Sequence, residues 1–300
     1  MTRRTVWCMA ACTLGVLGAP LRAQSDRYAP VVVQLPATPR ASVLGAGPGM
    51  RDIETIFSNP ALVGITAGTV VGLARYQAGT MLSMASAASL GSFSVGIGGQ
   101  YLDANADIPR LPFWSYSLRH GGPVAVASTV GAFGLATTFR GWRVGAAAKY
   151  LDERHGGFQD GTASLDLGVS RDVGRFTTGV TVQNIGAGIR YAGIGAQLPL
   201  RMSAGAAMYG YVAGPLDLGG SASVVVLPDG TVRPAIGVEA GYVPLDGYTF
   251  QARVGVRRPE LRAQNPLSFG GSASLDRFTL DYAFEDWNGK GTHRLALRVR

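Results

Sequence analysis

Cysteine, histidine and charge are scarce in this sequence. Both cysteines, Cys8 and Cys12, lie in an apolar stretch at the N-terminus. If that stretch is removed on export, the remaining chain has no thiol, which excludes a disulfide framework and cysteine-ligated metals. The three histidines occur at no metal-ligand spacing. We therefore expect no metal and no other cofactor.

A strongly basic face is also missing. The formal net charge is +8, and residues 1–23 contribute three arginines and no acid, so the remainder carries +5. Binding of nucleic acid would require lysines and arginines clustered on one face or along one helix. The sequence contains no such cluster. Nucleic acid is therefore not an expected partner.

The N-terminus has the three parts of an export signal. Arg3 and Arg4 form a positive start, residues 6–17 are apolar, and Leu21-Arg22-Ala23 fits a cleavage site. The apolar run is shorter than the ~20 residues that a membrane-spanning helix needs. We predict a signal peptide over residues 1–23.

Glycine, by contrast, is abundant. The chain has 43 glycines in 300 residues, roughly twice the usual share of 7%. Long helices are disfavoured by this composition, because each interior glycine costs about 1 kcal/mol relative to alanine. Residues 142–150, 248–257 and 278–285 alternate between apolar and polar side chains. Alternation over eight to ten residues is typical of a strand between two different environments. The sequence therefore predicts an all-β fold.

The alternating segments number about fourteen, an even number, as is usual for bacterial outer-membrane barrels. Short connections alternate with longer ones, which is typical of periplasmic turns and extracellular loops. A soluble barrel or sandwich would show the same alternation with its apolar face in the core. Export and the alternating loops favour the membrane, so we predict a transmembrane antiparallel β-barrel in the bacterial outer membrane, surrounded by its lipids. The predicted strands cover residues 65–77, 80–88, 92–102, 126–139, 142–152, 161–171, 174–184, 199–212, 215–227, 232–243, 247–257, 266–275, 277–285 and 292–300.

The polar faces of these strands carry charges of both signs. In a membrane barrel these faces line the lumen. The carboxylates could serve as acid–base pairs, but structural ion pairing is the commoner role of such groups. The predicted lumen residues are Arg143, Lys149, Asp166, Arg201, Glu239, Arg253, Asp281 and Arg294.

Residues 53–64, just before the first strand, show no alternation. Pro60 cannot donate to a strand ladder and biases Asn59 away from the helical region, which predicts a sharp turn. We interpret residues 41–64 as a plug inside the barrel, with Phe57, Asn59, Pro60 and Ala61 at its centre. An ordinary turn into the first strand is the alternative. The predicted domains are the signal peptide, a periplasmic lead-in and plug over residues 24–64, and the barrel over residues 65–300.

The longest predicted loop, residues 103–125, contains an aromatic cluster of Phe113, Trp114 and Tyr116. Such a cluster could contact a ligand or a partner segment. Packing of the loop on itself or on lipid headgroups is the alternative. Ser117 and His120 lie in the same loop, but a nucleophile also needs a third group to orient its base. Because the sequence indicates no such group, we predict no catalytic residue and no enzymatic activity.

Three stretches together resemble the PorV/PorQ-like outer-membrane proteins, which are relatives of the FadL-type barrels. Phe57-Ser58-Asn59-Pro60-Ala61 is similar to the plug motif of that family. Val182-Gln183-Asn184-Ile185-Gly186, followed by Leu198-Pro199-Leu200-Arg201, is similar to a second motif. Leu280-Asp281-Tyr282-Ala283 and residues 291–295 resemble the closing hairpin.

The resemblance implies a fourteen-stranded barrel with an N-terminal plug. For function it implies a component of type IX secretion or surface-protein handling, with exported proteins or other secretion components as partners. A FadL-like channel for small hydrophobic compounds is the alternative, and a purely structural barrel is the third. A packed lumen would favour secretion or a structural role, whereas a lateral opening or an apolar pocket near Phe57 would favour the channel.

Overall fold

The structure is a computed structural model that describes residues 30–77, 79–104, 126–155, 158–191, 194–259 and 264–300. The predicted signal peptide lies outside the described residues, as do Phe113, Trp114 and Tyr116. Among the described residues, no helix is long and apolar enough to cross a membrane.

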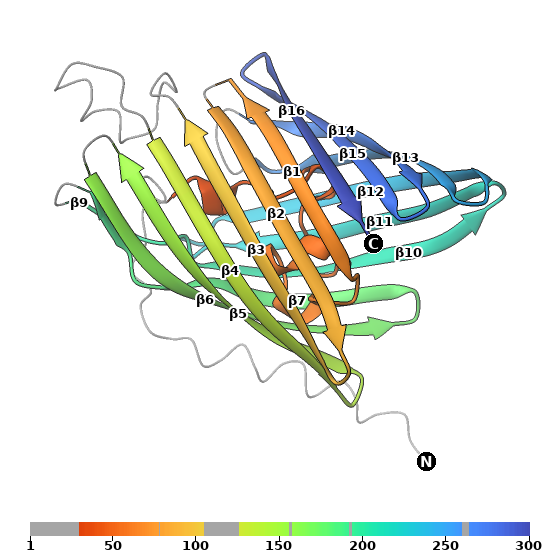
Figure 1. The fold of residues 1–300 in the computed structure, drawn as a ribbon, viewed down its shortest axis with the longest axis horizontal. Coiled ribbons are helices and arrows are strands. Elements are labelled where there is room, and N and C mark those ends of the chain that lie inside the picture. Colours follow the sequence, from red (N-terminus) through yellow and green to blue (C-terminus); the bar gives the residue numbers. More distant parts are fainter. Residues whose placement is uncertain (1–29, 78, 105–125, 156–157, 192–193, 260–263) are drawn as a thin grey trace.

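Fourteen strands form a closed barrel in which every strand is antiparallel to both neighbours (Figure 1). The barrel closes between the first and last strands, where Thr69 pairs with Val299. This architecture confirms the predicted all-β barrel and its strand number. The barrel strands are β1 (Gly68–Tyr76), β2 (Gly79–Leu90), β3 (Phe93–Ala104), β4 (Val126–Phe139), β5 (Trp142–His155), β6 (Phe158–Val173), β7 (Phe176–Gly186), β10 (Arg201–Ala213), β11 (Leu216–Val226), β12 (Val232–Leu245), β13 (Tyr248–Arg257), β14 (Gln264–Leu275), β15 (Phe278–Trp287) and β16 (Lys290–Val299).

Three connections differ from the prediction. β8 (Ile189–Tyr191) and β9 (Ile194–Ala196) form a hairpin within the predicted 185–198 loop, since strands of three residues are too short to show alternation. β5 and β6 extend through most of the predicted 153–160 loop, because its charged residues hide the period. The predicted 286–291 loop is shortened to a two-residue turn at Asn288-Gly289. Both residues have positive φ, the geometry for which Asn-Gly is strongly preferred.

The two ends of the barrel differ in the length of their connections. At one end all six have two residues, whereas at the other end three have two residues (β1–β2, β5–β6 and β15–β16) and four are longer (β3–β4, β7–β10, β11–β12 and β13–β14). Two-residue turns join β2 to β3, β4 to β5, β6 to β7, β10 to β11, β12 to β13 and β14 to β15. β1 begins and β16 ends at this same end, which we call the short-turn end. Short turns are periplasmic in outer-membrane barrels, so the opposite, long-loop end is extracellular.

The exterior of the barrel is apolar. Along β16, Leu295 and Leu297 face outward and are about half exposed, whereas Arg294 and Arg298 face inward and are buried. The same alternation exposes leucine, valine and aromatic side chains on the other strands. Lipid is the environment in which such a surface is stable, because apolar area in water is costly. The fold and the exterior together support the predicted outer-membrane location.

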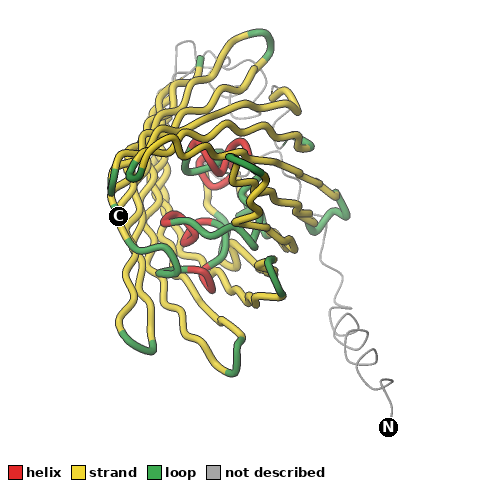
Figure 2. Tube along the Cα trace, turned by 90° about the vertical axis from the view of Figure 1, so that its right-hand side faces the viewer, coloured by secondary structure: helices red, strands yellow, loops and turns green. Residues whose placement is uncertain are grey.

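The segment before β1 lies inside the barrel (Figure 2). It contains η2 (Val32–Gln34), α1 (Pro39–Leu44), η3 (Ile53–Phe57) and η4 (Pro60–Leu62). The Thr38 hydroxyl caps α1 by accepting from the Ala41 N–H, and Gly45 ends the helix at φ 85°. We refer to residues 30–67 as the plug.

Candidate functional site inside the barrel

One side of the plug is apolar and packs on β16 and β1–β5. Ile53, Ile56 and Val63 are buried there together with part of Phe57. The wall residues that they meet are mainly alanines, whose small side chains leave room for the plug. The wall contacts include Val70, Ala85, Ala87, Ala132, Ala136, Ala147 and Ala296.

Asn59 organises the turn of the plug. Its side chain is completely buried, at 0% exposure. Its Oδ1 accepts from the Ala61 N–H at 3.0 Å, and its Nδ2 donates to the Pro48 carbonyl at 2.6 Å. Pro60 begins η4, where its missing N–H costs no hydrogen bond. The structure thus brings Asn59, Pro60 and Ala61 together inside the lumen, with Phe57 three residues along the chain from Pro60.

Three glycines on neighbouring strands accept this turn, and we call them the glycine seat: Gly145 on β5, Gly168 on β6 and Gly179 on β7. A Cβ atom at Gly168 would lie 2.1 Å from Asn59 Oδ1, and one at Gly145 would lie 2.4 Å from the Pro60 carbonyl oxygen. A Cβ at Gly179 would lie 2.1 Å from the Pro48 carbonyl oxygen. Only glycine permits such a close approach of the wall to the plug backbone.

The other side of the plug is held by buried charges. Arg40 donates to Asp52 at 3.0 Å and to Glu239 at 2.6 Å. Arg253 joins Glu239 to Asp281, with nitrogen–oxygen distances of 3.1 and 2.6 Å. Arg298 joins Asp281 back to Asp52, at 2.7 and 2.5 Å. These six residues form a closed ring of alternating charge, which we call the charge ring.

The charge ring links the plug to four barrel strands. Arg40 and Asp52 come from the plug, and the other members come from β12, β13, β15 and β16. All six side chains are buried. Replacing a buried ion pair with apolar groups is often neutral, whereas removing one partner leaves an uncompensated charge and costs several kcal/mol. The ring therefore specifies where the plug sits more than it adds net stability.

Glu54 is buried beside the charge ring and accepts a hydrogen bond from the Thr38 hydroxyl. Burial and the nearby charge of Asp52 raise the pKa of Glu54 to about 7. Burial also acts to raise the pKa of Asp52, but Arg298 and Arg40 outweigh it and hold that pKa well below its ordinary range. At neutral pH, Asp52 is therefore ionised, and Glu54 is close to half protonated.

This shift makes docking of the plug depend on pH. Released Glu54 has its ordinary pKa of 4.5, while docked Glu54 has a raised pKa of about 7. The docked state binds this proton more tightly than the released state does. The stabilisation of the docked plug relative to the released plug is therefore fully present below pH 4.5 and is lost as the pH rises through 7. The loss is about 3 kcal/mol, or roughly two orders of magnitude in the opening equilibrium. Glu54→Gln should remove this dependence.

Thiol labelling can measure plug opening, because the chain has no cysteine after residue 12 and an introduced cysteine is then the single site of labelling. A cysteine at buried Ser42, in α1, reports plug opening through its rate of thiol labelling. A cysteine at exposed Ser92, in the β2–β3 turn, corrects for the intrinsic pH dependence of the reagent. The labelling ratio of Ser42→Cys to Ser92→Cys should rise from pH 5 to pH 8. An equal rise in the Glu54→Gln background would contradict the assignment to Glu54.

All eight predicted lumen charges lie in the interior. Glu239, Arg253 and Asp281 are in the charge ring, and Lys149 pairs with Asp166 at 2.5 Å. The remaining three lie elsewhere in the lumen. Arg143 forms an ion pair with Asp172, Arg294 forms one with Glu285, and Arg201 lines a cavity.

Sequence reasoning missed the charged residues of the plug. Arg40, Asp52 and Glu54 were not among the predicted site residues. Together with Arg51 they are the only charges in residues 30–67. A few charges in an otherwise apolar, non-alternating segment were the available signal, and the burial of these side chains inside the barrel explains why the segment carries them.

Two cavities lie on opposite sides of the plug. A cavity of about 260 Å³ opens toward the short-turn end and is lined by Tyr209, Asp217 and four members of the charge ring. A smaller cavity of about 80 Å³ lies toward the long-loop end and is lined by Leu35, Phe57 and Arg201 among others. The two cavities share no lining residue. The docked plug thus separates them.

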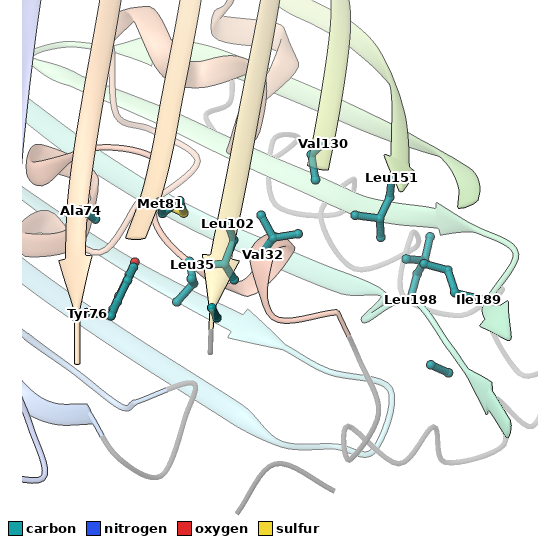
Figure 3. Packing of buried hydrophobic residues seen from close by; sticks show 12 residues of the cluster. Val32, Leu35, Ala74, Tyr76, Met81, Leu102, Val130, Leu151, Ile189 and Leu198 are labelled. Atoms are coloured by element: carbon teal, nitrogen blue, oxygen red, sulfur yellow. The ribbon is translucent and has the colours of Figure 1, made fainter. Parts of the chain in front are cut away.

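The long-loop half of the lumen contains an apolar cluster (Figure 3). Leu35 belongs both to this cluster and to the lining of the smaller cavity. The cluster joins the plug to β1–β5 and to the segment around the β8–β9 hairpin. Its larger members are Val32, Leu35, Tyr76, Met81, Leu102, Val130, Leu151, Ile189 and Leu198.

The described residues contain no group of three or more histidines, cysteines or carboxylates that could hold a metal ion. His293 lies on the exterior, where its Nδ1 is 2.8 Å from the Tyr282 hydroxyl. Ser117 and His120 lie outside the described residues.

No family model and no curated protein matches the sequence. Solved structures of similar fold include the toluene transporter TbuX of Ralstonia pickettii, at a TM-score of 0.58 and 12% identity, covering 88% of this chain and 98% of that one. The toluene transporter TodX of Pseudomonas putida has a TM-score of 0.55 and 11% identity, with coverage of 88% and 96%. A FadL homologue of Pseudomonas aeruginosa has a TM-score of 0.52 and 11% identity, with coverage of 88% and 97%.

These identities establish similarity of fold and no more. The PorV/PorQ resemblance has no support from a sequence comparison. What the structure and its neighbours establish is the coarser statement that the protein has the fold of the FadL-type fourteen-stranded outer-membrane barrels.

Proposed function

We propose that this protein is an outer-membrane channel for small hydrophobic compounds, the alternative that the sequence left open. The observation that carries the proposal is the apolar cluster in the long-loop half of the lumen, which borders a cavity directly beside the plug. The fold similarity to toluene transporters supports it. The apolar cluster offers a hydrophobic compound contacts that leave no polar group unpaired. The cavity itself has a mixed lining, in which Leu35 and Phe57 occur together with charged residues such as Arg201 and Arg257.

The docked plug is the closed state of this channel. The smaller cavity measures about 80 Å³, whereas an apolar cavity of roughly 150 Å³ is known to hold a benzene molecule. A monoaromatic compound therefore enters only when the plug or the cluster moves. The charge ring and the glycine seat hold the plug in place, so they set the free energy of opening.

Uptake of a radiolabelled monoaromatic hydrocarbon by Gram-negative cells tests the proposal. Cells that express the barrel should take up toluene faster than cells with an empty vector. Leu151→Asn, in the part of the apolar cluster that lies on wall strand β5, should lower that uptake roughly tenfold, because burying an unpaired amide costs about 1–3 kcal/mol. Leu151→Met, which keeps the site apolar and similar in volume, should retain it. Uptake equal to the vector control would refute the channel.

The secretion role implied by the resemblance stays a prediction, because no contact among the described residues favours it. Mass spectrometry of proteins that co-purify with the barrel in mild detergent separates the two roles. Exported proteins that share a C-terminal domain would support secretion. A stoichiometric hydrophobic compound with no protein partner would support the channel.

A further inference from the structure

Four arginines at the short-turn end lie over aromatic rings. Arg171 lies over Trp142, with 5.0 Å between its Cζ and the ring centroid, and Arg140 lies over Phe139 at 5.1 Å. The other two pairs are Arg175 over Tyr211, at 5.6 Å, and Arg277 over Phe278, at 5.9 Å. We call Arg140, Arg171, Arg175 and Arg277 the arginine rim.

The aromatic rings of the arginine rim belong to the lipid-facing surface. Phe139 is 66% exposed, and Trp142, Tyr211 and Phe278 are each 47% exposed. Phe139, Trp142 and Phe278 stand at strand ends next to two-residue turns, and Tyr211 lies two residues before the end of β10. Aromatic residues at this height mark the level of the lipid headgroups. The arginines above them therefore lie where lipid phosphates are.

The rim arginines have no carboxylate partner among the described residues, in contrast to the arginines of the charge ring. The aromatic ring beneath each guanidinium fixes the position of the guanidinium and adds a cation–π attraction. The N–H groups of the guanidinium stay available at its edge, in a planar arrangement that matches a phosphate. Four positioned cations, none of them in an ion pair with a described carboxylate, thus lie at the short-turn end, three of them on β4–β7 and their turns and one between β14 and β15.

We propose that the arginine rim binds the phosphates of anionic phospholipids in the periplasmic leaflet. The short turns place this end in that leaflet. An anionic lipid is preferred over a zwitterionic one, because the latter already carries a cation next to its phosphate and gains less from an added guanidinium. Binding at these points, on β4–β7 and at the β14–β15 turn, fixes the depth of the barrel in the membrane. The inference is independent of the proposed transport function.

Native mass spectrometry of the full barrel, released from mild detergent with added lipid, tests the inference. Phosphatidylglycerol should be retained in preference to phosphatidylcholine with the same acyl chains. In the variant with Gln at all four rim positions, the ratio of retained phosphatidylglycerol to retained phosphatidylcholine should fall roughly tenfold or more. The matched control replaces four exposed arginines at the long-loop end with Gln: Arg75, Arg154, Arg190 and Arg258. It removes the same charge and should keep the preference.

Equal retention of the two lipids by the unmodified barrel would overturn the inference. An equal loss of phosphatidylglycerol in the rim variant and in the control would also overturn it, since net charge alone would then account for binding. Folding of each variant is checked by the shift in gel mobility on heating.

Discussion

Asp52→Asn should release the plug from the barrel wall. The substitution leaves three guanidinium groups and two carboxylates in the buried charge ring. Breaking a buried pair in this way costs about 3–5 kcal/mol, which corresponds to an increase of a hundredfold or more in the opening equilibrium. Asparagine can still accept from the Ile53 N–H, the hydrogen bond by which Asp52 caps η3. The variant therefore tests the charge and spares the local turn.

Conductance in planar bilayers measures this effect, together with thiol labelling of Ser42→Cys. Both should rise sharply in Asp52→Asn. Asp172→Asn is the matched control, because Asp172 pairs with Arg51 and Arg143 at an exposed position. Exposed ion pairs contribute only about 0–1 kcal/mol, so this variant should stay closed. Equal conductance in the two variants would show that the charge ring does not hold the plug.

Gly168→Val should also expel the plug, by steric exclusion and not by charge. The new Cβ would lie 2.1 Å from Asn59 Oδ1, far inside van der Waals contact. Asn59 is held by two hydrogen bonds, so its amide cannot turn aside without losing the cap of η4. Overpacking costs about 1–3 kcal/mol where the structure can adjust and more where backbone must move. We expect an intact barrel with an undocked plug and a raised conductance.

Gly131→Val is the control for this prediction. Gly131 lies within β4 and has no atom within 4 Å of an added Cβ. Valine favours strands at both positions, so the two variants share any effect on the wall itself. A closed channel in Gly168→Val would refute the close fit between seat and plug. A raised conductance in Gly131→Val would assign the effect to the barrel wall.

The motif that underlies the PorV/PorQ resemblance has a structural role here. Gln183 donates to the Phe57 carbonyl at 2.8 Å, and so ties β7 to the plug. Asn184 adopts a positive φ of 61°, and its side chain donates to the Pro199 carbonyl at 2.9 Å. Residues that shape a plugged barrel are useful to a secretion component and to a channel alike. This motif therefore predicts the architecture and cannot separate the two functions.

Alternation by itself determined the barrel strands and which side chains share a face, because a period of two follows directly from strand geometry. The export signal and the alternation of short and long connections were needed in addition to assign the apolar face to lipid and the polar face to the lumen. Together these signals assigned every predicted charge to the lumen without naming its partner. Asp52 and Arg298 are 246 positions apart, and only closure of β1 against β16 brings them together. The plug has no regular period, so its charged side became visible only against the wall. Tertiary structure alone decided the charge ring and the glycine seat, since both depend on which strands are neighbours.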